Sequence, residues 1–168
     1  MNSHQAAWWE QAQSDLGVLI LLRRNSAAPC HQLHYMQMVA EKLAKAYFWR
    51  TGTPPPRNHA GLVQFMRSLG GVPMQRRLQL AAALEFHDFG QLQAWIRRVL
   101  PMAYELERLA PALAQDGPNP EYPWPHHAPT AYPAGHWFDP WGRMTDTGLG
   151  RQFLRVLEMA VHKFPAYT

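Results

Sequence analysis

Cationic and aromatic side chains that could hold a phosphate gather around one predicted helix end. Lys42, Lys45 and Trp49 recur at i+3 and i+4 spacing, so they share one helical face. Arg57 and His59 follow after a proline-rich turn. Together these residues could bind a nucleotide or RNA, because cations pair with phosphate and an aromatic ring stacks on a base. The alternative is a pair of solvated lysines, with Lys45 joined to the glutamate four residues before it.

The histidines do not predict a metal site. His31 and His34 are three residues apart on the same predicted helix, a spacing that metals use. No cysteine, aspartate or glutamate lies nearby at partner spacing, so we expect neither a metal ion nor a cofactor. His126, His127 and His136 lie in a proline-rich segment, from which they could approach a site, but exposed histidines need no function.

Motifs of several enzyme classes are absent from the sequence. There is no glycine-rich phosphate loop, Walker-type lysine or Gly-x-Ser-x-Gly turn, which excludes kinase, NTPase and hydrolase assignments. Basic residues occur instead at Arg23-Arg24, Arg67, Arg76-Arg77 and Arg97-Arg98. They could line a surface for RNA or an acidic partner, or be separate solvated positions.

Composition favours one domain over residues 1–168, because the length fits a single domain. The chain is 47% hydrophobic and 17% charged, with a net charge of +4 and a pI near 9.5. This mildly basic balance is compatible with nucleic acid without requiring it. The single cysteine, Cys30, permits no intramolecular disulfide, and the apolar run Leu16–Leu22 is too short to span a bilayer. With no signal peptide visible, we expect a cytoplasmic protein without membrane contact.

Hydrophobic periodicity predicts an all-α fold of about five to six helices. Prolines inside the fifth helix predict a kink or a division into two. The expected helices run from about 5 to 24, 31 to 51, 60 to 69, from Pro73 onward, 88 to 115 and 146 to 163.

Residues 117–143 should form a long loop before the last helix. Seven prolines lie between Pro118 and Pro140, a density that we expect to exclude helix. Tyrosines and tryptophans alternate with them, whereas disordered segments are poor in aromatic residues. We therefore predict an ordered loop packed on the helices, and regard it as a candidate functional element.

The order and spacing of several motifs resemble the HEPN family, the higher eukaryotes and prokaryotes nucleotide-binding domains. The family's first helix is similar to Trp9–Leu16, and its Ala-Ala-Glu-Lys-x-x-Lys-Ala pattern is similar to Val39–Ala46. The resemblance continues through the turn at Gly52, the His59-x-x-Leu62 stretch and an aromatic-proline stretch, Asn119–Pro123. It implies an up-down helical bundle of the kind found in prokaryotic toxin–antitoxin and defence systems.

Many HEPN proteins are metal-independent ribonucleases that use an Arg-x4-6-His motif across a dimer cleft. The resemblance assigns this role to Arg155 and His162, where arginine would stabilise phosphate charge and histidine would move protons. Seven residues are two helical turns, so both side chains can share a face. Two departures put activity in doubt, because Val156 replaces the usual polar residue and the motif lies later than in the family. An ordinary amphipathic helix with two surface polar residues is the alternative.

Three functions remain open from the sequence. The first is a HEPN-like protein with a degenerate nuclease motif, which binds nucleotide or RNA or a partner such as a nucleotidyltransferase. The second is an active ribonuclease that uses Arg155 and His162. The third is a structural helical dimer built on tryptophans such as Trp8, Trp9 and Trp95.

Overall fold

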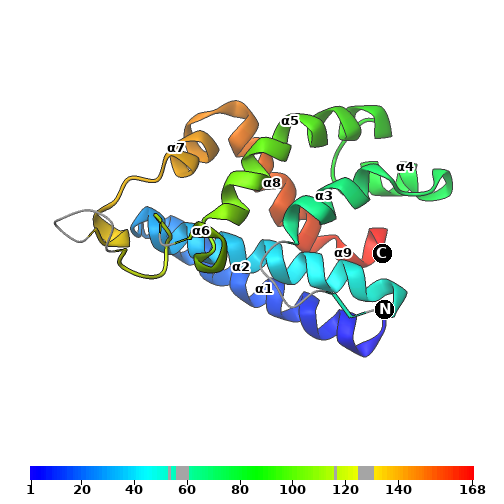
Figure 1. Ribbon diagram of the computed structural model, residues 1–168. Coiled ribbons are helices and arrows are strands. Elements are labelled where there is room, and N and C mark those ends of the chain that lie inside the picture. The colour runs from blue at the N-terminus through cyan, green and yellow to red at the C-terminus, as the bar shows by residue number, and fades with distance from the viewer. Residues whose placement is uncertain (53, 56–60, 116, 125–130) are drawn as a thin grey trace.

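The computed structural model of the protein describes most of the chain: residues 1–52, 54–55, 61–115, 117–124 and 131–168. Within these ranges the chain is all-helical, which confirms the predicted fold class (Figure 1). Its one extended pairing is an antiparallel bridge between Trp124 and Ala131. The helices are α1 (Ser3–Arg24), α2 (Pro29–Phe48), the 3-10 helix η1 (Trp49–Thr51), α3 (Leu62–Gly70), α4 (Met74–Ala83), α5 (Phe89–Arg108), α6 (Pro111–Ala114), the 3-10 helix η2 (Pro133–Gly135), α7 (Asp139–Asp146), α8 (Gly148–His162) and α9 (Phe164–Tyr167).

The two long helices α1 and α2 form an antiparallel hairpin that runs the length of the molecule (Figure 1). Asn2 caps α1, since its side-chain oxygen accepts the N–H of Gln5 at 2.8 Å. Pro29 lies in the first turn of α2, where a missing N–H breaks no helical hydrogen bond. Both helices begin two residues before their predicted starts, and η1 completes the predicted second helix up to Thr51.

The helices α3, α5 and α8 cover one side of this hairpin (Figure 1). Buried apolar side chains from all five helices join one hydrophobic cluster. Burying a large apolar side chain stabilises the fold by about 2 kcal/mol, so this cluster holds the helices together. Its largest fully buried aromatic members are Tyr47, Phe65, Phe138, Phe153 and Phe164.

The two prolines of the predicted fifth helix behave differently. Pro101 lies inside α5 without ending it, and its ring is exposed to solvent. Pro111 begins the separate short helix α6, since α5 ends at Arg108. The predicted division is therefore confirmed at Pro111, where proline suits the first turn of a new helix.

The proline-rich segment packs against the helices, as predicted for the part that the structure describes. Trp124 and Phe138 are buried in the core. The expectation that this segment lacks helix was wrong, because η2 lies within it and α7 begins at Asp139. Pro140 causes no conflict there, since it lies in the first turn of α7. His126 and His127 lie outside the described residues.

Short helices raise the number of segments above the five or six expected. The described ranges contain nine α-helices, because α6, α7 and α9 are additional to the predicted elements. The last long helix, α8, begins at Gly148 and not near Asp146, since α7 occupies the preceding residues. In the part of the chain that the structure describes, no helix combines the length and apolar character needed to cross a bilayer.

Candidate functional site

Helix α8, which carries Arg155 and His162, is fixed in place by its first turn. The Thr147 hydroxyl accepts the N–H of Gly150 at 3.0 Å and so caps the helix. Gly150 lies so close to α7 that a Cβ there would be 2.2 Å from the carbonyl oxygen of Arg143. The predicted inward face is confirmed, since the following residues are buried: Phe153, Val156, Leu157, Ala160 and Val161.

Arg155 and His162 consequently point outward from α8. The Arg155 guanidinium forms an ion pair with Glu85, although its side chain remains 70% exposed. His162 Nε2 lies 3.8 Å from Glu158 Oε1, one turn earlier on the same helix. Two turns, or about 10 Å of helix, separate the arginine from the histidine. Within one chain, each basic group therefore has its own carboxylate neighbour, and neither lines a cavity found among the described residues.

An open groove lies between the end of α1 and α8. It has a volume of about 390 Å³ and is lined by Ile20, Arg23, Arg24 and Glu158. Both arginines belong to the last turn of α1, where the helix dipole favours positive charge. Since Glu158 is also the neighbour of His162, the groove joins two guanidinium groups to the imidazole. Polyanions are suited to such a surface.

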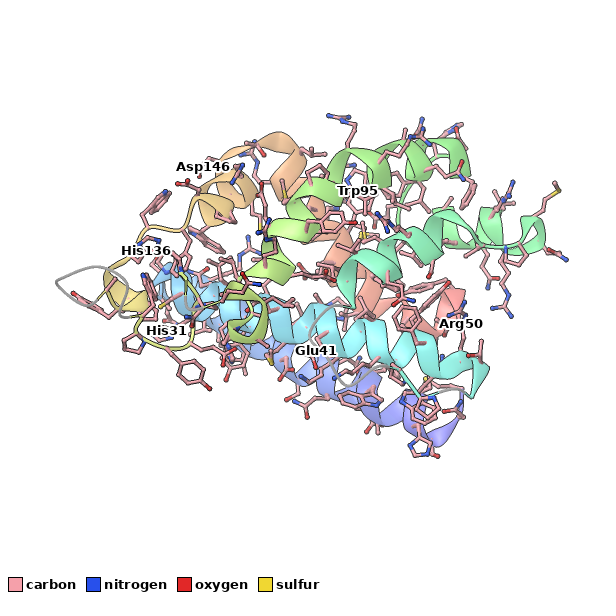
Figure 2. All side chains as sticks on the ribbon, viewed as in Figure 1. His31, Glu41, Arg50, Trp95, His136 and Asp146 are labelled. Atoms are coloured by element: carbon pink, nitrogen blue, oxygen red, sulfur yellow. The ribbon has the colours of Figure 1, made fainter. Side chains whose placement is uncertain are left out.

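The predicted phosphate-binding lysines surround a buried carboxylate. Lys45 Nζ lies 2.5 Å from Glu41 Oε1, and Lys42 Nζ lies 3.7 Å from the same oxygen. The Glu41 side chain is 7% exposed and that of Lys45 is 15% exposed, so both are largely covered. Figure 2 shows Glu41 midway along α2. The Glu41–Lys45 pair is thus confirmed, but a ligand phosphate would compete with Glu41 for both ammonium groups.

The aromatic ring beside these lysines comes from α1. Lys45 Nζ lies 4.8 Å from the centre of the Trp8 ring, a cation–π contact. Trp49, the predicted stacking residue, is instead stacked on His4 with ring centres 4.3 Å apart. Sequence reasoning missed Trp8 because the contact joins two helices. Arg57 and His59, the other predicted members of this site, lie outside the described residues.

The proline-rich segment is attached to α2 by polar contacts. His34 Nδ1 lies 3.3 Å from Glu121 Oε1, and Asn119 Oδ1 accepts the N–H groups of Glu121 and Tyr122. The acidic neighbour of His34 thus comes from a remote segment, which helical spacing could not reveal. Among the described residues there is no group of three or more histidine, cysteine, aspartate or glutamate side chains that could hold a metal ion.

Comparison with known proteins adds no relative to this picture. The chain matches no protein-family model, no curated protein and no solved structure. Its function must therefore be argued from its own residues and their geometry.

Proposed function

We propose that this chain is a HEPN-like helical module that binds RNA, with Arg155 and His162 as a degenerate nuclease pair. The order of the motifs along the sequence supports the family assignment, and the net charge of +4 suits an anionic ligand. A prokaryotic toxin–antitoxin or defence system is the setting that the resemblance implies.

The groove between α1 and α8 is the observation that carries RNA binding. Arg23 and Arg24 are exposed along it, and their guanidinium groups have the fork geometry that pairs with phosphate oxygens. His162 lies at its border through Glu158. An extended RNA backbone would contact the two arginines first, because they bear the positive charge of the groove lining.

The geometry of α8 supports binding without cleavage. A ribonuclease needs a proton-transfer group and a cation close to one reacting phosphate. Arg155 is engaged by Glu85, and His162 lies two turns away on an open helical surface. Cleavage would require Arg155 to leave Glu85, or a second chain to complete the site.

A charge-removal experiment tests the RNA groove. We expect Arg23→Ala/Arg24→Ala to weaken binding of labelled single-stranded RNA about tenfold or more, and to lower the salt dependence by about two phosphate contacts. The matched control is Arg97→Ala/Arg98→Ala, which removes an equally exposed arginine pair from α5. Equal affinity in both double variants would contradict the assignment of the groove, because only nonspecific charge would then matter.

A partner protein is the second candidate function, and the outer face of α4 favours it. Met74 and Leu78 lie one turn apart and are 78% and 75% exposed. Exposed apolar side chains at i, i+4 spacing are typical of a helix that docks on another protein. Light scattering of the wild type and of Met74→Gln/Leu78→Gln tests this, since a dimer held by α4 would dissociate in the variant.

A further inference from the structure

A second cavity lies at the opposite end of the α1–α2 hairpin from the RNA groove. It has a volume of about 260 Å³ and forms where the end of α2 meets the α3–α4 turn and α9. Figure 2 shows Arg50 at this end of α2. The side chains that matter for its chemistry are Tyr47, Arg50, Ser68, Arg76 and Tyr167.

The cavity is cationic. Arg50 and Arg76 line it, and no aspartate or glutamate is among its described lining residues. The Arg50 guanidinium lies 3.7 Å from the centre of the Tyr47 ring and donates to the Tyr47 carbonyl at 2.9 Å. Arg76 donates one bond, of 3.0 Å, to the backbone oxygen of Thr168. A guanidinium has five N–H donors, so each arginine keeps donors for a ligand.

A buried hydroxyl group completes the lining. Tyr47 is only 2% exposed, and among the described residues its hydroxyl has no hydrogen-bond partner. The neighbouring hydroxyl of Tyr167, by contrast, donates to the carbonyl of Ala160 at 2.6 Å. Burial raises the pKa of the Tyr47 phenol, and Arg50 and Arg76 oppose this shift. The phenol therefore keeps its proton at neutral pH and can donate it to an anion.

The beginning of α4 adds partial positive charge at the rim. Pro73 lines the cavity and is the N-cap of this ten-residue helix, without a side-chain hydrogen bond to the first turn. The uncapped N–H groups of a helix start attract anions. Two guanidinium groups, one hydroxyl and one helix start thus surround the same space.

We propose that this cavity binds the phosphate group of a phosphomonoester, either a mononucleotide or a smaller phosphorylated metabolite. A tetrahedral phosphate has three terminal oxygens pointing in different directions, which suits donors from Arg50, Arg76 and Tyr47. A planar carboxylate would satisfy fewer of them. The proposal does not depend on RNA binding, because Arg23 and Arg24 lie at the other end of the hairpin.

Titration calorimetry with inorganic phosphate, AMP, adenosine and acetate tests the proposal. We expect phosphate and AMP to bind, and adenosine and acetate not to bind. Tighter binding of AMP would assign the site to a nucleotide, whereas equal binding would assign it to a simpler phosphomonoester. No binding of either phosphate compound at millimolar concentration, or equal binding of acetate, would overturn the proposal.

Two variants and a control locate the site. Tyr47→Phe removes one oxygen and preserves the packing of the ring, so we expect about tenfold weaker phosphate binding with an unchanged circular dichroism spectrum. Arg50→Gln/Arg76→Gln should abolish binding. Arg97→Gln is the control for loss of one exposed arginine, and Arg23→Ala/Arg24→Ala should also bind phosphate normally, which separates this site from the RNA groove. Unchanged affinity in Tyr47→Phe and in the double variant would overturn the assignment.

Discussion

Charged residues of the two helices that resemble HEPN motifs lie in opposite environments. On α2, Glu41 is buried and Lys45 is largely covered. On α8, Arg155 and its partner Glu85 are exposed. Charges withdrawn from water need their partners, whereas exposed pairs are screened by solvent and contribute little. The α2 cluster should therefore stabilise the fold, while the α8 charges should be available for ligands.

The largest expected effect follows from breaking the buried cluster. Glu41→Gln leaves two lysines beside a neutral group, and we expect it to lower the free energy of unfolding by about 3 kcal/mol. The matched change Glu85→Gln should cost less than about 1 kcal/mol, because the Arg155–Glu85 pair is exposed. Urea unfolding of both variants measures this difference. Equal losses would show that burial does not distinguish the two helices.

The next effect concerns the placement of α8. A methyl group at Gly150 would lie 2.2 Å from the Arg143 carbonyl oxygen, so Gly150→Ala must push α7 and α8 apart. We expect a loss of about 2 kcal/mol, typical of overpacking. Gly148→Ala is the control, because a methyl group there meets nothing within 4 Å. Thermal unfolding compares them, and similar melting temperatures would contradict the close packing of α7 on α8.

A smaller effect should appear as a dependence of stability on pH. Burial raises the pKa of Glu107, although its carboxylate accepts the N–H of Val63 at 2.8 Å. The folded protein therefore binds this proton more tightly than the unfolded chain does. Glu107 contributes stability at pH values below its unfolded pKa, and this contribution is lost as pH rises through the folded pKa.

Glu107→Gln isolates this contribution, because the amide oxygen can still accept the Val63 N–H. We expect the stability of the wild type to fall relative to the variant as pH rises from the ordinary glutamate range toward neutrality. Unfolding in urea at a series of pH values measures both proteins. Two parallel stability profiles would contradict the raised pKa.

Features that repeat along one helix could be predicted from the sequence, and contacts between remote segments could not. The inward face of α8 follows from the spacing of residues such as Phe153 and Val161. The cation–π contact of Lys45 with Trp8 and the meeting of Arg50 with Arg76 join segments far apart in the chain. Helical periodicity describes one element at a time, so it carries no signal for such pairs.

The proline-rich segment shows a second limit of the sequence argument. Proline density predicted a helix-free loop, but α7 begins where Pro140 occupies the first turn. Proline disrupts a helix interior and suits its start, so its position matters more than its frequency. The burial of Trp124 and Phe138 followed better, because aromatic side chains in a loop favour packing on a core.

Metal-free incubation with labelled RNA tests the central claim most directly. Single-stranded and structured RNA would be incubated with the wild type and with Arg155→Ala/His162→Ala, and binding and cleavage would be followed together. Our account predicts that both proteins bind RNA and that neither cleaves it. Cleavage by the wild type that is lost in the double variant would contradict the account and make Arg155 and His162 a working ribonuclease pair.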